Sequence, residues 1–118
     1  YSISEINSIL KGNFLQENKA AIITQACIDT RQITNAVQSI FFCLVARNDG
    51  HQYIENAYKK GIRNFIISKK IEIIDFEDAN FILVENTLVA LQQLATFHRA
   101  QFNIPVIGKR LQNNAEMF

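Results

Sequence analysis

Residues 39–51, which read SIFFCLVA followed by RNDGH, decide the fold class of this chain. Positions 40–45 are apolar without interruption, a pattern typical of a strand that is covered on both faces. The polar residues that follow lead into a helical pattern over 51–60, which ends at Gly61, a residue suited to a left-handed helix end. A buried strand followed by a helix is the repeating unit of layered α/β proteins.

Further elements are predicted on both sides of this unit. Ser4 is the expected N-cap of a short helix that Gly12-Asn13 would stop, and Asn86 is the expected N-cap of a long helix. The centre of the core is expected at Phe41, Phe42, Cys43, Leu44, Ile66 and Ile67. Additional strands are expected over residues 20–28, 62–68, 81–84 and 104–107. Strands that alternate with helices predict an α/β fold in which a mixed or mostly parallel sheet is flanked by helices.

The composition is that of one globular domain. The chain has 118 residues, is 48% hydrophobic and carries a formal net charge of +1. A nucleic-acid-binding domain would gather its Lys and Arg on one face, whereas the basic residues here are scattered, and Lys59-Lys60 and Lys69-Lys70 are interpreted as solvated surface. No stretch approaches the ~18 apolar residues of a membrane span and no signal peptide is recognisable, so a cytoplasmic location is the default expectation. We expect neither a nucleic acid nor a membrane as a partner.

The cysteines and histidines do not form a metal-binding pattern. Cys27 and Cys43 lie in apolar runs and lack the Cys-x-x-Cys spacing, so burial as small hydrophobic residues is the simplest interpretation. A disulfide between them stays open. His98 lies on the apolar stripe of its predicted helix, which favours a buried structural histidine over a catalyst. We expect no metal and no catalytic residue in this chain.

Two polar clusters follow predicted strands, at the positions where α/β folds bind ligands. One is Asp29-Thr30-Arg31, and the other runs from Arg47 to His51. Arg offers a planar fork of donors to phosphate or carbonyl groups, and Gly50 allows close backbone approach. The free N–H groups of the following helix favour an anion. Simple turns are the alternative, with Asp29 bridging to Arg31 and Asp49 capping the next helix.

The chain holds no complete catalytic arrangement. The sequence pattern contains no nucleophile beside a base, no pair of catalytic carboxylates and no phosphate loop. Gly108-Lys109 lacks the earlier glycine of such a loop, and Arg110 stands where Ser or Thr is needed. We therefore expect the chain alone neither to hydrolyse ATP nor to form an amide bond.

In order and spacing, these motifs resemble the N-terminal domain of the Mur ligases. The matching segments are Ile28-Asp-Thr-Arg31, Ile40-Phe-Phe-Cys-Leu44, Asp49-Gly-His-Gln-Tyr-Ile54, Ala57-Tyr-Lys-Lys-Gly-Ile62, Asn64-Phe-Ile-Ile67, Asn86-Thr-Leu-Val-Ala-Leu-Gln-Gln-Leu-Ala95 and Pro105-Val-Ile-Gly108. The resemblance covers residues 1–108, whereas the tail of residues 109–118 does not match the family. Thr30 replaces the usual Ser. The loop before Asp49 is about one residue short and has Ala46 where Gly is usual.

The resemblance implies that residues 1–108 recognise a UDP-sugar, holding the uridine and diphosphate end of UDP-N-acetylmuramoyl-peptide. The implied substrate-binding residues are Thr30, Arg31, Ala46, Arg47, Asn48, Asp49 and Gly50, with Asp29 and His51 in support. No cofactor is implied for this chain, because ATP and Mg²⁺ would belong to the central domain of a full-length ligase. The implied partners are the substrate and the central and C-terminal ligase domains.

Within the family, residues 97–108 are most similar to the branch that adds D-alanyl-D-alanine, the MurF type. The branch that adds the third peptide residue, the MurE type, is the alternative. The Ile-, Lys- and Asn-rich composition resembles that of Bacteroidetes proteins, among which the MurF-type ligase can be fused to an alanine racemase, and this partner stays open. A stand-alone interaction module without a sugar ligand is a third alternative, which the gene sequence beyond codon 108 would separate from a ligase.

Overall fold

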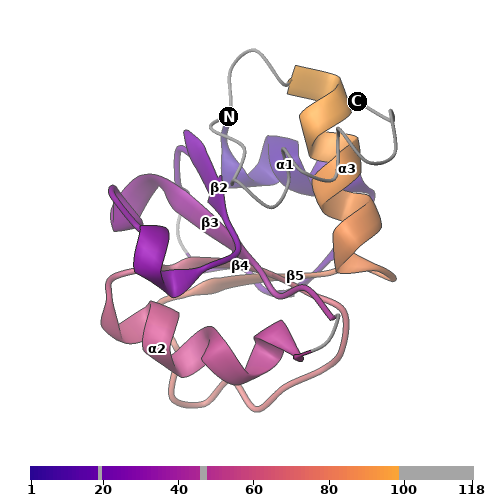
Figure 1. Ribbon diagram of the computed structural model, residues 1–118. Coiled ribbons are helices and arrows are strands. Elements are labelled where there is room, and N and C mark those ends of the chain that lie inside the picture. The colour runs from indigo at the N-terminus through magenta and orange to yellow at the C-terminus, as the bar shows by residue number, and fades with distance from the viewer. Residues whose placement is uncertain (19, 46–47, 99–118) are drawn as a thin grey trace.

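The computed structural model describes residues 1–18, 20–45 and 48–98. Within these ranges, one sheet of five strands lies between two layers of helices (Figure 1). In spatial order the strands are β1 (Asn13–Gln16), β5 (Asn80–Leu83), β4 (Asn64–Ile67), β3 (Ser39–Phe42) and β2 (Gln25–Cys27). Strands β2 to β5 run parallel, and β1 pairs antiparallel with β5. The predicted α/β class, with a mixed and mostly parallel sheet, is confirmed.

The described helices cover both faces of the sheet. Helices α1 (Ile3–Leu10) and α3 (Thr87–His98) lie on one face, and α2 (Ile54–Lys59) lies on the other (Figure 1). The short 3-10 helices are η1 (Thr30–Gln32), η2 (Ala36–Gln38) and η3 (Gly50–Tyr53), of which η3 leads directly into α2. Asn86 caps α3 as predicted, since its side-chain oxygen accepts a hydrogen bond from the backbone N–H of Val89 at 3.1 Å.

Alternation along the strands divides the core between the two layers. Ile40 and Phe42 pack with α1 and α3, whereas Phe41 and Cys43 pack on the side of α2. Every residue of β3 and β4 is buried, as expected for strands covered on both faces. The expectation of a fully buried Leu44 is wrong, because β3 ends at Phe42 and Leu44 lies partly exposed in the turn that follows.

Helix α1 is capped by Ser2 rather than by Ser4. The hydroxyl of Ser2 accepts a hydrogen bond from the backbone N–H of Glu5 at 3.1 Å, and the Glu5 carboxylate accepts one from the backbone N–H of Ser2 at 2.8 Å. This reciprocal pair satisfies two N–H groups that have no partner within the helix, so it outcompetes a cap at Ser4.

The chain after α1 forms a strand that the sequence did not predict. Helix α1 ends at Lys11, which itself adopts the left-handed conformation with a φ of 53°. The role of Gly12 is to let the chain pack closely against β5, because a Cβ on Gly12 would lie 2.5 Å from Ile82 Cγ2 of that strand. Strand β1 begins directly after Gly12. Of the strand expected over residues 20–28, only Gln25–Cys27 belongs to the sheet. The strand expected over 104–107 lies outside the described residues.

The amino edge of the sheet is closed by polar side chains at the first positions of the parallel strands. Asn80 donates to the side-chain oxygen of Asn64 at 2.9 Å, and Asn64 donates to the backbone carbonyl of Ser39 at 3.3 Å. The hydroxyl of Ser39 donates in turn to Gln25 at 3.1 Å, and the backbone N–H of Asn18 donates to Asn80 at 2.8 Å. Because buried polar groups need such partners, this row fixes the strands at one edge.

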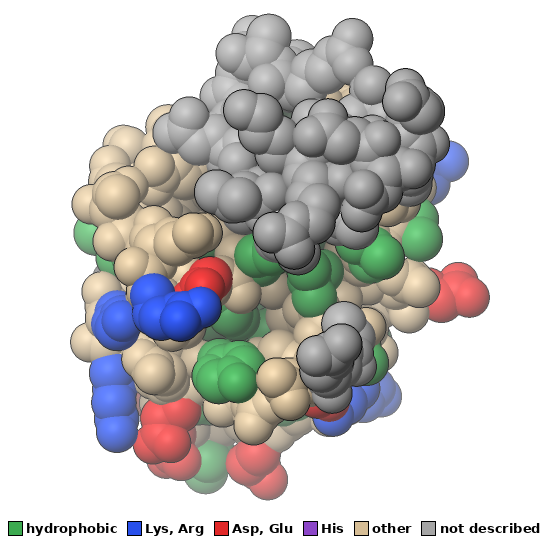
Figure 2. Space-filling view, viewed as in Figure 1, with side chains coloured by type: hydrophobic (Ala, Val, Ile, Leu, Met, Phe, Trp, Pro, Cys, Tyr) green, Lys and Arg blue, Asp and Glu red, His purple; other side chains and the backbone are tan. Residues whose placement is uncertain are grey.

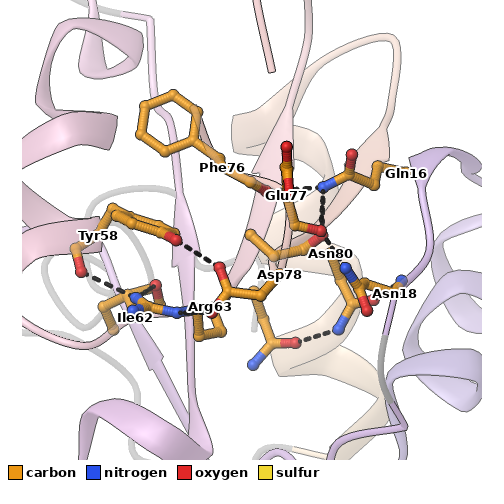
Figure 3. Close-up of polar contacts among 11 residues, drawn as sticks. Gln16, Asn18, Tyr58, Ile62, Arg63, Phe76, Glu77, Asp78 and Asn80 are labelled. Carbon is orange, nitrogen blue, oxygen red and sulfur yellow. Dashed lines mark hydrogen bonds and ion pairs between the residues drawn. The ribbon is translucent and has the colours of Figure 1, made fainter. Parts of the chain in front are cut away.

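A second polar cluster ties α2 to the connection before β5 (Figure 3). Arg63 donates to the Asp78 carboxylate at 3.0 Å, and its guanidinium carbon lies 3.8 Å from the centre of the Tyr58 ring. The Tyr58 hydroxyl donates to the same carboxylate. On the other side of the connection, Gln16 donates to the backbone carbonyls of Phe76 at 2.7 Å and Ala79 at 2.8 Å. These contacts tie the amino edge of the sheet to α2 and to the connection before β5.

Candidate functional site

The two polar clusters predicted from sequence follow neighbouring parallel strands. Residues 29–31 come after β2, and residues 48–51 come after β3. The carboxyl ends of β2 and β3 meet at one edge of the sheet, since these strands pair in parallel. Ala46 and Arg47, two of the predicted substrate-binding residues, lie outside the described residues. Asn48 is exposed at the surface of the same loop.

The first cluster is held together internally. Arg31 folds back onto Asp29, with its Nε at 3.0 Å and its Nη2 at 2.7 Å from the carboxylate oxygens. Asp29 also caps η1, because the backbone N–H of Arg31 donates to it at 2.9 Å. The hydrogen bonds from Arg31 hold the pKa of Asp29 below its usual range. Thr30 offers its backbone carbonyl to Lys60 Nζ at 2.9 Å, which links the cluster to the end of α2.

In the structure, Asp29 and Arg31 form a local bridge. This is one of the interpretations that the sequence left open. The side chain of Arg31 is 85% exposed, so the ion pair is solvated. Within the described residues, no hydrogen bond or ion pair joins this cluster to residues 48–51. The two clusters therefore share an edge of the sheet without forming one network.

The second cluster is built around Asp49. Its carboxylate accepts hydrogen bonds from the backbone N–H of His51 at 2.9 Å and from His51 Nδ1 at 2.6 Å, so Asp49 caps η3 as predicted. The same carboxylate contacts the ammonium group of Lys69 from the end of β4. The hydrogen bond from Lys69, followed by that from the His51 backbone, holds the pKa of Asp49 well below its ordinary value.

His51 is a structural link between two strand ends. Its side chain is only 4% exposed, and its Nε2 accepts a hydrogen bond from the backbone N–H of Ser68 at 3.0 Å. Because Nε2 accepts, the ring proton lies on Nδ1, where it is donated to Asp49. His51 therefore fixes the loop after β3 to the end of β4.

Gly50 lies where the loop after β3 folds back against the backbone at the end of that strand. Its N–H donates to the carbonyl of Leu44 at 2.7 Å. A Cβ on Gly50 would come within 2.8 Å of both the nitrogen and the oxygen of Leu44. The residue is thus needed to close the loop against the end of β3. Thr87, at the start of α3, holds the same strand end by donating its hydroxyl to the carbonyl of Cys43 at 2.8 Å.

The contact of Lys69 with Asp49 is one that sequence reasoning missed. The Lys69-Lys70 doublet is exposed, as the sequence predicted, and Lys69 also pairs with Asp49 across two strand ends. The signal available in the sequence was that the doublet directly follows a buried strand. In the view of Figure 2, Lys and Arg side chains form separate groups among acidic ones, so that face has no continuous basic surface.

The groups at this edge are polar and cationic side chains, with two buried thiols nearby. Among the described residues, no group of three or more His, Cys, Asp or Glu is placed to hold a metal ion, and no helix is long and apolar enough to cross a bilayer. Cys27 and Cys43 are both buried and free, and burial raises the pKa of the Cys27 thiol to about 12. Backbone N–H groups of both clusters are donated within the protein, among them those of Arg31, Gly50 and His51. The hydroxyl of Thr30 and the cationic side chains of Arg31 and Lys69 are therefore the groups that suit an anionic ligand here.

Comparison with known proteins supplies the family. No protein-family model matches the chain. The UDP-N-acetylmuramoyl-tripeptide–D-alanyl-D-alanine ligase of Synechocystis sp. is 36% identical over 87 residues, 73% of this chain and 18% of the ligase. The ligase of the same name from Rickettsia prowazekii is 42% identical over 60 residues, 51% of this chain and 13% of the ligase. That of Bacillus subtilis is 28% identical over 109 residues, 91% of this chain and 23% of the ligase.

The chain belongs to the Mur ligase family. Among solved structures, MurF from Acinetobacter baumannii superimposes with a TM-score of 0.68 at 19% identity, covering 86% of this chain and 21% of that protein. At this identity the structural likeness establishes the fold. The three relatives above all carry the name of the D-alanyl-D-alanine ligase, which supports the MurF type over the MurE alternative. This Mur ligase chain spans only 13–23% of the length of these relatives.

Proposed function

We propose that the chain is the N-terminal substrate-recognition domain of a MurF-type ligase, which adds D-alanyl-D-alanine to UDP-N-acetylmuramoyl-tripeptide in peptidoglycan synthesis. The observation that carries the proposal is similarity over 73% of the chain to a ligase of that name, at 36% identity. The fold supports it, because the predicted polar clusters follow the carboxyl ends of parallel strands, next to a hollow at the ends of β4 and β5, where α/β folds bind ligands.

The proposed substrate-binding residues are those of the two strand ends. Thr30 and Arg31 would bind from the end of β2, with Asp29 holding Arg31 in place. Backbone groups of residues 46–48 would read the uracil edge, and Gly50 would keep the loop closed behind them. Asp49 and His51 would orient this loop through their contacts with η3 and β4.

The chain would contribute positioning rather than chemistry. Holding the UDP-sugar in a fixed place removes part of the entropic barrier to amide formation. ATP and Mg²⁺ would bind in the central domain of a full-length ligase, in the cytoplasm. Under this proposal the domain comprises residues 1–108, while the segment beyond residue 98 lies outside the described structure.

A competition experiment tests the proposal. Fluorescently labelled UDP-N-acetylmuramoyl-tripeptide is added to the 118-residue chain, and its anisotropy is followed while unlabelled compounds compete. We expect weak binding that UDP reverses, because the domain offers only part of the site of a whole ligase. D-alanyl-D-alanine and ATP should leave the anisotropy unchanged. Absence of binding at millimolar chain concentration, or displacement by ATP as effective as that by UDP, would refute the proposal.

A further inference from the structure

A groove runs along α3 beside α1, on the face of the sheet opposite α2 (Figure 1). It has a volume of about 440 Å³ and is lined by one residue of α1 and five of α3, namely Ile9, Val89, Gln92, Gln93, Thr96 and Phe97. None of these side chains carries a charge. The groove therefore differs from the carboxyl edge of the sheet, where lysine and carboxylate side chains meet.

The walls of the groove combine apolar and amide side chains. Leu91 and Leu94 of α3 are fully buried in the core, whereas Val89 is 45% exposed. Ile9 packs against the core from α1 and also lines the groove. The amide groups of Gln92 and Gln93 can each donate and accept hydrogen bonds. Because an extended peptide needs apolar contacts for its side chains and polar partners for its backbone, the groove suits an extended, uncharged segment.

The chain itself carries a segment of this chemistry. Residues 101–107 read QFNIPVI, have no charged side chain and include four large apolar residues, Phe102, Ile104, Val106 and Ile107. Pro105 biases the residue before it towards an extended backbone, which reduces the entropy lost when the segment is ordered. The match in charge and polarity favours this segment as the occupant of the groove.

The position and length of the segment also fit. Helix α3 ends at His98, and its last turn lines one end of the groove. Seven extended residues span about 23–25 Å. Helix α3 has 12 residues and is therefore about 18 Å long. A segment tethered this closely has a high effective concentration at the groove, which favours it over a separate molecule.

We propose that residues 101–107 bind in the groove between α1 and α3, running back along α3. Their apolar side chains contact Ile9 and Val89, and their backbone groups exchange hydrogen bonds with Gln92 and Gln93. This contact is separate from the proposed substrate site at the carboxyl edge of the sheet, and it makes the segment that follows α3 part of the same folded domain.

Tryptophan fluorescence tests the proposal, because the chain contains no tryptophan of its own. In the Phe102→Trp variant, the indole should be shielded by the groove. We expect its emission at shorter wavelength than that of Met117→Trp, and acrylamide should quench it about threefold less efficiently. Adding Val89→Glu places a charge in the groove and should remove both differences. The matched control is Ile74→Glu, because Ile74 is 68% exposed outside the groove, and its replacement should leave the indole shielded.

The possible outcomes separate the occupants. Circular dichroism checks that each variant is folded, and if Val89→Glu unfolds the chain, Gln93→Glu at an exposed position takes its place. An indole that is quenched as readily in Phe102→Trp as in Met117→Trp would overturn the proposal. Equal effects of Val89→Glu and Ile74→Glu would do the same. Shielding that disappears when the chain is diluted would assign the groove to a second copy of the chain, which also contradicts the proposal.

Discussion

Gly50→Ala should be the most damaging small substitution near the proposed site. The added Cβ would lie 2.8 Å from the nitrogen and the oxygen of Leu44 and 3.0 Å from the carbonyl carbon of Cys43. All three are backbone atoms, so no side-chain rotation relieves the contact. The loop must open, which also stretches the 2.7 Å hydrogen bond from Gly50 N–H to Leu44. Overpacking costs about 1–3 kcal/mol and a lost hydrogen bond about 1 kcal/mol, so we expect a loss of about 2–4 kcal/mol.

Urea unfolding followed by circular dichroism measures this loss. In thermal unfolding, the melting midpoint of the Gly50→Ala variant should fall by roughly 10 °C for a domain of this size. Gln52→Ala is the matched control, because Gln52 is exposed in the same short helix and its truncation should cost less than about 0.5 kcal/mol. A Gly50→Ala variant as stable as the parent chain would show that the loop does not close against β3 as described.

Three further predictions concern the core, the response to acid and catalysis. Ile66→Ala should lower the free energy of unfolding in urea by about 2–5 kcal/mol, because Ile66 is fully buried on a central strand. Glu72 is exposed, and a loss as small as that of Glu72→Ala would contradict the layer assignment. The folded pKa of Asp49 lies below its unfolded value of about 3.9, so the stability that Asp49 contributes is present above that pH and is lost as the pH falls towards the folded pKa. Asp49→Asn should therefore flatten the plot of unfolding free energy against pH below about pH 5. An unchanged acid slope would count against the Lys69 and His51 contacts. The chain alone should release no phosphate from ATP, because its sequence contains no complete phosphate loop, and ATP-dependent release by the purified chain would disprove this.

The central layer of the fold could be predicted because its signals are local and strong. The apolar run after Ser39 predicts a strand buried on both faces, and its first part forms that strand, which ends at Phe42. Gly61 ends the α2 segment with a φ of 106°, as its position predicted. The helix expected from residue 51 is instead a 3-10 turn followed by α2 from Ile54, a distinction that hydrophobic spacing does not resolve.

The errors lie where two local signals compete or where the partner is distant. Ser2 and Ser4 are both plausible caps, and only the reciprocal bond with Glu5 decides for Ser2. Strand β1 has four residues and depends on pairing with β5, about seventy positions away in sequence. Such pairing leaves no periodic pattern in the strand itself.

The local roles of the candidate site residues could be predicted better than their distant contacts. Asp49 and Gly50 perform the capping and close approach that their types suggested. The partner of Asp49 was missed, because an ion pair with Lys69 joins two loops that the sequence separates by twenty residues. Arg31 pairs with its neighbour Asp29, which was one of the two interpretations that the sequence left open.

The central claim is that a UDP-sugar binds at the carboxyl edge of this sheet. It is tested most directly by titrating the ¹⁵N-labelled chain with UDP-N-acetylmuramoyl-tripeptide and mapping the amide shifts. The account predicts saturable shifts at residues 30–31 and 48–51 and around Ser68, Lys69 and Lys70. Shifts confined to the amino edge, around Asn18, Arg63 and Asp78, would contradict it.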